Sequence, residues 1–305
     1  MKTLEVQKIR KSFGAFVAVD DVSFTVDESC VFGIIGPNGA GKTTTLRMVM
    51  NIIAPDAGTV AILGNTERSR SADLIGYLPE ERGLYRKMKV GDLLTFMMDL
   101  KAMPRRESRK AIDIWLQRLD ITEWKHKKIE ELSKGMQQKV QFLGTIMHKP
   151  RLLILDEPFG GLDPINVNVI KEIMLELKKE GTSIIFSTHV MESAEKLCDE
   201  IFLINKGRQL LYGKLGEIKK SYGSENVLIE FEGSDEFLKT SQQIKKFDNY
   251  GNYVEAQLVK NADPQQLLRE AMQNNAIRRF EIKSPSLNDI FIEAVNNSNS
   301  GRSES

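Results

Sequence analysis

The chain has 305 residues, in which 43 Lys and Arg nearly balance 42 Asp and Glu, for a formal net charge of +1. This length is typical of two domains, and the near-neutral charge argues against a strongly basic nucleic-acid-binding protein and an acidic disordered chain. With two cysteines and no apolar run near the ~18 residues that cross a bilayer, we expect a cytosolic chain without a disulfide framework, zinc knuckle, secretion signal or membrane span.

The first 220 or so residues alternate between predicted strands and helices. Apolar residues that alternate with polar ones or form short unbroken runs predict strands at Leu4–Ile9, Val22–Val26, Cys30–Ile35, Thr59–Leu63, Leu152–Leu155 and Ser183–Ser187. Helical spacing predicts helices over Thr44–Ile53 and Val90–Trp124, and after each of the last two strands. This order predicts an α/β fold with a mostly parallel, doubly wound sheet.

A smaller α/β domain is predicted from about Tyr222, which divides the chain into residues 1–221 and 222–305. This second part has nine Lys and Arg against 13 Asp and Glu, so its charge differs in sign from that of the first part. Its predicted strands are Asn226–Glu232, Tyr253–Val259 and Ile277–Lys283. Its predicted helices are Asp235–Ile244, Pro264–Asn274 and Ser286–Asn296, the last with Ser286 and Asp289 in capping-box spacing. From about residue 297 we expect a disordered polar tail.

A phosphate-binding loop is predicted between the third strand and the first helix. The pattern G-x-x-x-x-G-K-[ST] is matched by Gly36, Pro37, Asn38, Gly39, Ala40, Gly41, Lys42 and Thr43. Glycines let backbone N–H groups surround a phosphate, Lys42 can reach the outer phosphates, and the Thr43 hydroxyl can bind Mg²⁺. The loop indicates nucleotide binding but does not choose between a kinase, a GTPase and a motor ATPase.

Two carboxylates follow the buried strand Leu152–Leu155. Asp156 is placed to hold Mg²⁺ opposite Thr43, and Glu157 is placed to polarise an attacking water as a general base. Taken alone, an acidic pair at this position would more simply cap the strand. The phosphate-binding loop makes the catalytic interpretation the stronger one.

Three short motifs around this pair carry a family resemblance. Leu132-Ser133-Lys134-Gly135 lies upstream, and Gly161-Leu162-Asp163 and Thr188-His189 follow. The order of phosphate-binding loop, Leu-Ser-x-Gly, Asp-Glu-Pro, Gly-Leu-Asp and Thr-His resembles the ATP-binding cassette (ABC) ATPases over roughly residues 1–220. The resemblance implies a P-loop ABC ATPase domain, with a mixed, mostly parallel sheet and a helical subdomain at about residues 85–135, that binds ATP and Mg²⁺.

The resemblance also implies a role for each matching residue. Phe13 would stack on adenine, the alternative being a core phenylalanine, and the loop from Gly36 to Thr44 would hold the phosphates. Glu157 and His189 would be catalytic, and Glu80 would act beside them and bind the metal with Thr43 and Asp156. Ser133, Gly135 and Asp163 would serve the ATP bound by a second ATP-binding subunit, because such proteins act as head-to-tail homodimers or heterodimers.

The sequence departs from the family pattern at three points. Glu80 occupies a position where glutamine is usual, and a carboxylate can bind Mg²⁺ but cannot donate a hydrogen bond as an amide does. Lys134 and Met136 replace a glycine and a glutamine of the signature motif, with Lys134 directed either to phosphate or to solvent. Phe13 replaces the more usual tyrosine and retains an aromatic face.

Features that are missing from the sequence exclude several classes of ABC protein. Long coiled coils, a second cassette and membrane spans are all lacking, which favours an ATPase subunit that energises export through a separate integral membrane permease, with no nucleic-acid partner. Such a subunit is peripheral, on the cytoplasmic side of a bacterial-type cell membrane. Gly76–Val90 and the closing Pro285–Phe291 resemble the sodium-extrusion and drug-export branch, in which a small α/β domain follows the cassette. For residues 222–305 the sequence leaves two roles open, regulation and dimerisation. The alternative is a non-transport ATPase that acts as a nucleotide-gated regulatory module.

Overall fold

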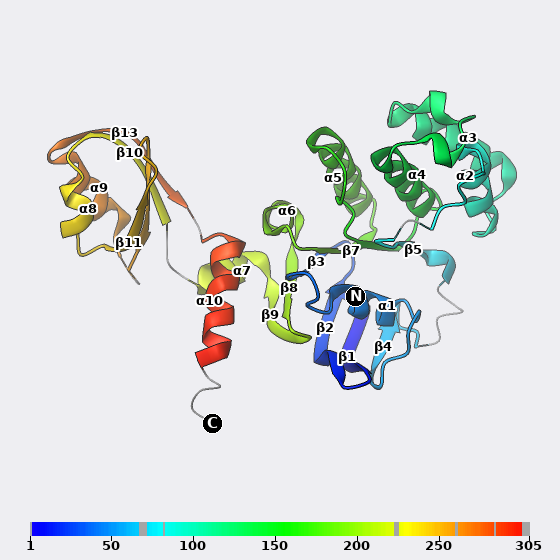
Figure 1. Cartoon of the computed structure of the whole chain (residues 1–305), viewed down its shortest axis with the longest axis horizontal. Helices are drawn as coiled ribbons and strands as arrows, with labels where there is room; N and C mark the ends of the chain where they lie inside the picture. The colour runs from blue at the N-terminus through cyan, green and yellow to red at the C-terminus, as the bar shows by residue number, and fades with distance from the viewer. Residues whose placement is uncertain are drawn as a thin grey trace. The chain divides into compact units, whose positions relative to one another are not determined.

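Two compact units make up the chain. The computed structural model describes residues 2–66, 72–81, 83–222, 226–259, 262–283 and 285–300 (Figure 1). Unit 1 is Met1–Gly213 and unit 2 is Lys214–Ser305. The division falls earlier in the chain than the predicted 221–222, because the short helix α7 (Leu215–Ser221) groups with unit 2.

A six-stranded sheet forms the centre of unit 1. Its order is β5-β6-β7-β3-β8-β9, and the neighbouring pairs from β5 to β8 are parallel. The strands are β3 (Val31–Ile35), β5 (Ile75–Leu78), β6 (Leu152–Asp156), β7 (Ser183–Thr188), β8 (Glu200–Asn205) and β9 (Arg208–Lys214). Ile35 pairs with Thr188 and Asp156 pairs with Ser187, so β3, β6 and β7 end at the same edge. The predicted mostly parallel α/β sheet is confirmed.

A second sheet covers one face of this parallel sheet, together with helix α1 (Lys42–Val49), as Figure 1 shows. It is antiparallel, in the order β2-β1-β4, and consists of β1 (Lys2–Phe13), β2 (Phe16–Asp27) and β4 (Ala57–Ile62). Phe24 of this sheet packs on Phe32 and Phe202 of the parallel sheet, with ring centroids 5.2 and 5.0 Å apart. Burial of these large apolar side chains is the main force that holds the two sheets together.

Helices cover the opposite face and build the helical subdomain (Figure 1). They are α2 (Val90–Asp99), α3 (Arg105–Arg118), α4 (Lys134–Ile146), α5 (Pro164–Lys179) and α6 (Met191–Leu197), with short 3₁₀ turns at Ala72–Leu74, Thr122–Trp124 and Ile129–Glu131. The helical stretch predicted over Val90–Trp124 is interrupted between α2 and α3. Ala102 has a φ of 52°, outside the range of a right-handed helix, and Pro104 has no backbone N–H with which to continue the hydrogen bonds of α2.

Unit 2 contains an antiparallel four-stranded sheet in the order β11-β12-β10-β13. Its elements besides α7 are β10 (Asn226–Gly233), α8 (Glu236–Thr240), β11 (Ile244–Asn249), β12 (Val254–Leu258), α9 (Pro264–Met272), β13 (Asn275–Lys283) and α10 (Leu287–Ser300). The three predicted strands are present. The side chains of β10 and β12 form the core of this unit with those of α8 and α9.

Two expectations for unit 2 need correction, and a third is confirmed. The helix expected over Asp235–Ile244 is only the five-residue α8, and Ile244 instead begins the strand β11. Helix α10 continues to Ser300, so residues 297–300 are helical where a disordered tail was expected, and residues 301–305 lie outside the described residues. The Ser286–Asp289 capping box is formed, since each residue's backbone N–H donates to the other's side chain.

In the described part of the chain, no helix combines the length and apolar character needed to cross a membrane.

Candidate active site

The phosphate-binding loop lies at the edge where β3, β6 and β7 end. Gly36 follows β3 directly and Lys42 begins α1, so the backbone N–H groups at the start of that helix face the space beyond the sheet edge. Gly41 has a φ of 106°, and a Cβ there would stand 2.6 Å from the Ala18 carbonyl oxygen. At Gly36 a Cβ would stand 2.2 Å from the Ile204 carbonyl oxygen. Glycine is therefore required at both positions for the loop to keep this shape.

The Lys42 side chain is buried inside the loop, with 6% of its surface exposed. Its Nζ donates to the carbonyl oxygens of Gly36 at 2.9 Å and Pro37 at 3.2 Å. It also lies 3.4 Å from Glu157 Oε1. An ammonium group held by three oxygens at the mouth of a ring of N–H groups is placed to meet a phosphate oxygen.

Asp156 ends β6 and is connected to the neighbouring strand and to the loop. Ser187 Oγ donates to Asp156 Oδ1 at 2.5 Å, and Thr43 Oγ1 donates to the same oxygen at 3.3 Å. Burial raises the pKa of Asp156 above its ordinary value, and the charges of Glu80 and Glu157 act in the same direction. The two hydroxyl donors lower that pKa in part. The carboxylate is thus held in a place where negative charge is costly.

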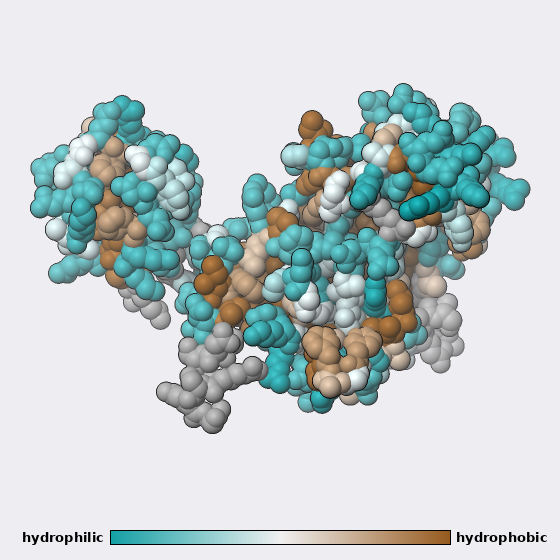
Figure 2. Space-filling view, in the orientation of Figure 1, coloured by the Kyte–Doolittle hydropathy of each residue, from teal (hydrophilic) through white to brown (hydrophobic). Residues whose placement is uncertain are grey.

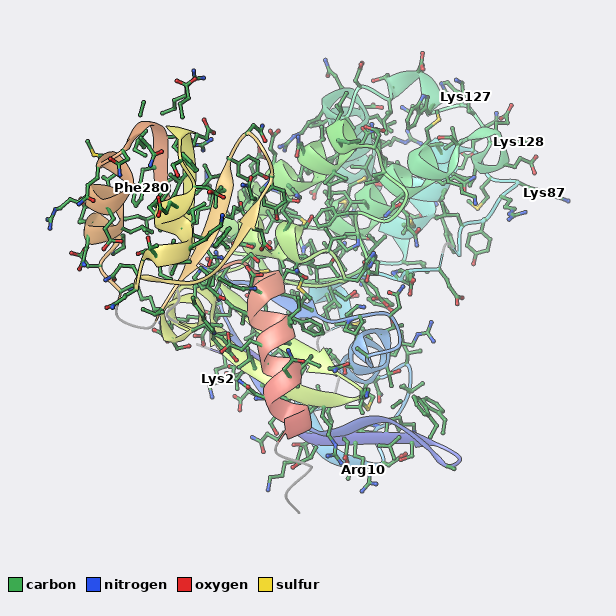
Figure 3. All side chains as sticks on the ribbon, turned by 60° about the vertical axis from the view of Figure 1, so that its left-hand side comes forward. Lys2, Arg10, Lys87, Lys127, Lys128 and Phe280 are labelled. Carbon is green, nitrogen blue, oxygen red and sulfur yellow. The ribbon has the colours of Figure 1, made fainter. Side chains whose placement is uncertain are left out.

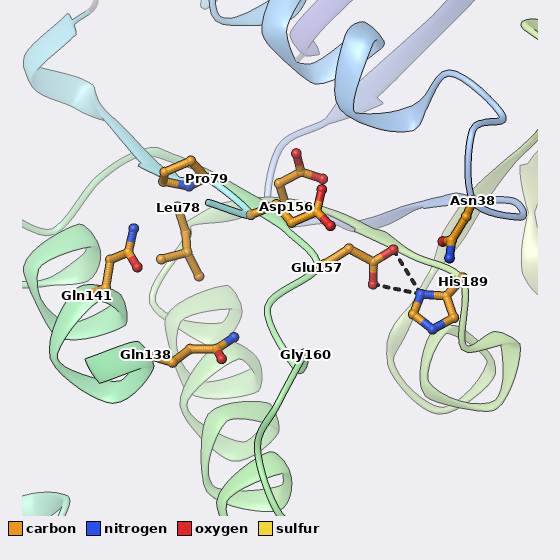
Figure 4. Close-up of a pocket in the computed structure, with 10 residues that line it drawn as sticks. Asn38, Leu78, Pro79, Gln138, Gln141, Asp156, Glu157, Gly160 and His189 are labelled. Atoms are coloured by element: carbon orange, nitrogen blue, oxygen red, sulfur yellow. Dashed lines mark hydrogen bonds and ion pairs between the residues drawn. The ribbon is translucent and has the colours of Figure 1, made fainter. Parts of the chain in front are cut away.

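Glu157 is paired with His189 across the site. His189 Nδ1 lies 3.1 Å from both Oε1 and Oε2 of Glu157, an approach that requires the nitrogen to donate its proton to the carboxylate (Figure 4). The Glu157 backbone has a φ of 49° and its N–H donates to Ser187 Oγ at 3.0 Å. This uncommon backbone conformation turns the carboxylate away from β6 and toward the phosphate-binding loop.

The oxygen atoms around Thr43 suit Mg²⁺. Asp156 Oδ2 is buried and has no hydrogen-bond partner among the described residues, while Thr43 Oγ1 lies 3.5 Å from Glu80 Oε2. Mg²⁺ prefers carboxylate and hydroxyl oxygens, and usually keeps ligands from water and substrate phosphates. In the described ranges no group of three or more His, Cys, Asp or Glu side chains is placed to hold a metal ion.

Replacement of Asp156 by Asn should remove most of the rise in melting temperature that Mg²⁺ and ATP together give the wild-type chain. For the wild-type chain, ATP with Mg²⁺ at about 100 times the dissociation constant should raise Tm by about 5–10 °C, since such binding stabilises by ~2.7 kcal/mol. We expect Asp156→Asn to lose most of this rise, because the buried Oδ2 has no hydrogen-bond partner among the described residues and is therefore the oxygen left open to a metal. Thermal unfolding with ATP and either Mg²⁺ or a chelator measures the effect, with the exposed Asp248→Asn as control. An unchanged Mg²⁺ response in Asp156→Asn would contradict the assignment.

Two hollows adjoin at this edge of the sheet. The first has a volume of about 310 Å³, and its lining includes Glu80, Asp156, Glu157 and His189 (Figure 4). The second has a volume of about 290 Å³ and lies over the phosphate-binding loop. It is lined by Phe16, Ala18, Asn38, Gly39, Gly41, Lys42, Thr43, Thr44, Glu80 and Glu157.

The hollow over the phosphate-binding loop has one aromatic residue in its described lining. Phe16 lines the hollow over the loop, whereas the described lining does not include Phe13. The two residues are paired partners at the turn between β1 and β2, and both are more than half exposed. Neither is a core phenylalanine. In this structure Phe16 is the aromatic residue that lines the hollow over the loop.

The remaining predicted residues lie at two helix starts outside these hollows. Ser133 is the N-cap residue that precedes α4, and its side chain accepts the Met136 N–H at 3.3 Å. Asp163 accepts the Asn166 N–H at 3.0 Å and begins α5, and this donor lowers the Asp163 pKa. A Cβ on Gly135 would lie 3.5 Å from the Gly161 carbonyl oxygen, so the two starts are neighbours. The structure therefore forms one group around Lys42 and a second around Ser133.

Sequence reasoning missed three polar residues of the site. Ser187 links Asp156 to Glu157, and Gln138 and Gln141 of α4 line the same hollow as these carboxylates. Gln138 Nε2 donates to the Pro158 carbonyl oxygen at 2.7 Å, which ties α4 to the segment after Glu157. Ser187, Gln138 and Gln141 are all buried in the structure. In the sequence, the signal for them was a polar residue within a segment expected to be buried, because a buried polar side chain requires a hydrogen-bond partner.

Comparison with known proteins agrees with both units. Residues 19–160 match the family model described as ABC transporter, and residues 213–295 match that of the ATP-binding protein DrrA1-3-like C-terminal domain. The ABC transporter ATP-binding protein YhaQ of Bacillus subtilis is 44% identical over 96% of this chain and 98% of its own length. The Nod factor export ATP-binding protein I of Rhizobium sp. is 31% identical over 95% of each chain. A solved ATP-binding subunit of an ABC transporter, 30% identical, superposes with a TM-score of 0.68 over 72% of this chain and 93% of that one.

Proposed function

The chain belongs to the ATP-hydrolysing, ATP-binding subunits of ABC transporters, and we propose that it energises export through a membrane permease carried on a separate chain. The observation that carries the ATPase part is the convergence of Lys42, Asp156, Glu157 and His189 at one sheet edge. Export is favoured by the similarity over almost the full length to a relative that is named for export, and by the C-terminal domain of the DrrA-like type.

The residues divide the work of hydrolysis in this proposal. Lys42 and the backbone N–H groups of the loop hold the outer phosphates of ATP, and Thr43, Asp156 and Glu80 hold Mg²⁺. Bound Mg²⁺ neutralises charge on the phosphate oxygens. Glu157 orients a water molecule and accepts its proton, while His189 fixes the direction of the Glu157 carboxylate through the two 3.1 Å contacts.

A second ATP-binding subunit completes each site. Ser133 caps the start of α4, where Gly135 lies in the first turn, and Asp163 caps the start of α5. These two neighbouring helix starts lie apart from the Lys42 group. A helix start attracts anionic groups, which suits contact with ATP held by another subunit. In a head-to-tail dimer two ATP molecules then lie between the subunits. Binding closes this dimer, and hydrolysis with product release reopens it.

An apolar hollow supports the docking of a membrane permease. It has a volume of about 330 Å³ and lies where α1 and β5 meet α2 and α4, with Met50, Tyr77, Met97 and Leu100 in its lining. His148 also lines it, and burial lowers the pKa of His148 to about 4, so the imidazole is neutral near pH 7. Lys101 also lines the hollow, and its Nζ donates to the carbonyl oxygens of Ala72 and Ile75. The lining thus combines apolar side chains with one cation that the protein already hydrogen-bonds, which suits a largely apolar helix of the permease.

Purification from membranes tests the permease partner. The tagged full chain, produced in its native host and isolated from detergent-solubilised membranes, should carry a polytopic membrane protein in stoichiometric amount. Met97→Glu, which places a charge in the apolar hollow, should lose this partner and retain ATP binding. Recovery of only soluble partners would instead support the second candidate, a nucleotide-gated regulatory module whose effector is the DrrA-like unit 2.

Replacement of Phe16 by Ala should weaken ATP binding about tenfold. Phe16 is 64% exposed and lines the hollow over the phosphates, so its ring is free to stack on the adenine base. Stacking of a base on an aromatic ring contributes about 1–3 kcal/mol. Titration of each variant with a fluorescent ATP analogue measures the loss, and Phe13→Ala is the matched comparison. A larger loss in Phe13→Ala than in Phe16→Ala would return the stacking role to Phe13.

A further inference from the structure

Two loops of the helical subdomain form one basic surface. The first precedes α2 and contains Arg86, Lys87 and Lys89, and the second follows the 3₁₀ turn Thr122–Trp124 and contains Lys125, Lys127 and Lys128. We call these six residues the basic ridge. Figure 3 shows Lys87, Lys127 and Lys128 together at one edge of unit 1, and Figure 2 shows hydrophilic residues over the region of α2 and α3.

Backbone hydrogen bonds hold the two loops side by side. Lys89 and Lys128 form an antiparallel bridge, and the Ile129 N–H donates to the Met88 carbonyl at 3.0 Å. The first N–H groups of α2, those of Val90 and Gly91, donate to the carbonyls of Lys127 and Lys125 at 3.0 and 2.9 Å. Because the backbone is fixed in this way, the six cationic side chains are presented as one surface rather than as two independent loops.

Most of the positive charge of the basic ridge is not neutralised by the protein. Lys125 pairs with Asp113 at 2.5 Å, and Lys128 pairs with Glu130 at 3.7 Å. Arg86, Lys87, Lys89 and Lys127 are exposed, and each lacks an ion-pair partner among the described residues. Four uncompensated like charges at neighbouring positions repel one another, so an anionic partner would stabilise this arrangement.

An aromatic pair adjoins these charges. Tyr85 directly precedes Arg86 and is 57% exposed, and its ring meets the Phe96 ring edge-on with centroids 5.7 Å apart. The ridge consists of loop residues, and its six residues lie outside the two hollows of the site and the apolar hollow described above. Exposed cations on two adjoining loops, with an exposed aromatic ring beside them, suit a broad anionic plane such as a membrane surface.

We propose that the basic ridge binds the phosphate headgroups of an anionic lipid bilayer directly. Lys and Arg side chains near a membrane surface are attracted to anionic lipids, and Tyr is favoured at the level of the headgroups. The contact requires no permease, because the ridge lies wholly on this chain. Its test can therefore fail while the proposed ATPase function stands, and the reverse also holds.

Vesicle sedimentation of the purified full chain tests the proposal. Vesicles of phosphatidylcholine with about 30% phosphatidylglycerol should bind the wild-type chain, and those of phosphatidylcholine alone should not. Binding should fall as salt rises from about 0.05 to 0.5 M, since screening weakens exposed charges. The variant Arg86→Gln/Lys87→Gln/Lys89→Gln/Lys127→Gln should bind at least about tenfold more weakly.

A control variant changes four exposed lysines elsewhere, Lys2, Lys110, Lys149 and Lys179, to glutamine. It has the same net charge as the ridge variant and should bind as the wild type does. Circular dichroism and ATP binding should be unchanged in both variants, which shows that they are folded. Equal loss in the two variants, or binding of the wild type to uncharged vesicles, would overturn the proposal. So would failure of the wild type to bind anionic vesicles, and an acidic segment of a protein partner would then be the better occupant.

Discussion

Replacement of Lys42 by Ala is expected to lower ATP affinity at least about a hundredfold, a loss of ~2.7 kcal/mol or more. The reason is geometric. Nζ is the cationic group at the mouth of the phosphate-binding loop, and it is buried among the Gly36 carbonyl, the Pro37 carbonyl and Glu157. In Lys42→Ala the outer phosphates of ATP would have no buried cation beside them among the described residues that line the hollow. The carbonyls of Gly36 and Pro37 would also lose their hydrogen-bond donor.

Equilibrium binding of a fluorescent ATP analogue, with steady-state ATP hydrolysis beside it, measures the effect of Lys42→Ala. Lys149→Ala is the matched control, because Lys149 is exposed and lies outside both hollows of the site. Thermal unfolding without nucleotide shows whether the loop variant is folded. Affinity within about threefold of the wild type would mean that the loop does not hold the phosphates through Lys42.

Replacement of Glu157 by Gln is expected to separate binding from hydrolysis. The amide keeps the shape of the carboxylate but cannot accept a proton from water, so turnover should fall by about 10²–10⁴-fold. Repulsion from bound phosphates also disappears, because Glu157 lies within 3.4 Å of the Lys42 ammonium that holds them. ATP affinity should therefore be kept or raised, and ATP should accumulate in a closed dimer.

Sedimentation velocity with ATP or ADP detects that dimer. Glu157→Gln should roughly double its mass with ATP and remain monomeric with ADP, while the wild type should form the dimer only transiently. Glu180→Gln, an exposed position on the same domain, is the control. A variant that hydrolyses ATP at the wild-type rate would remove Glu157 from the role of general base.

The sequence was most informative where function depends on local order along the chain. The glycines of the loop and the apolar runs before Gly36 and Asp156 predicted a strand–loop–helix unit and an adjoining carboxylate, and the structure has both elements at one sheet edge. These features depend on a few consecutive residues. Backbone geometry and strand burial then determine where their side chains point.

Features that depend on the pairing of strands far apart in the sequence could not be predicted in this way. The position of Phe16 in the lining of the hollow follows from the β1–β2 turn, where it pairs with Phe13, and residue spacing alone does not define that pairing. Ser187 became a site residue only because β7 pairs with β6 and brings it beside Asp156. The strand β11 was missed because its exposed edge position requires few apolar residues, so its alternation is weak.

The ATPase rate of the chain together with its membrane partner tests the central claim most directly. Steady-state hydrolysis should be measured for the wild type, Lys42→Ala and Glu157→Gln, each purified in the same complex and with Mg²⁺ present. We predict that both variants fall to about 1% of the wild-type rate or below, Lys42→Ala through lost ATP binding and Glu157→Gln with binding retained. Unchanged hydrolysis in both variants would contradict an ATPase site at this edge of the sheet.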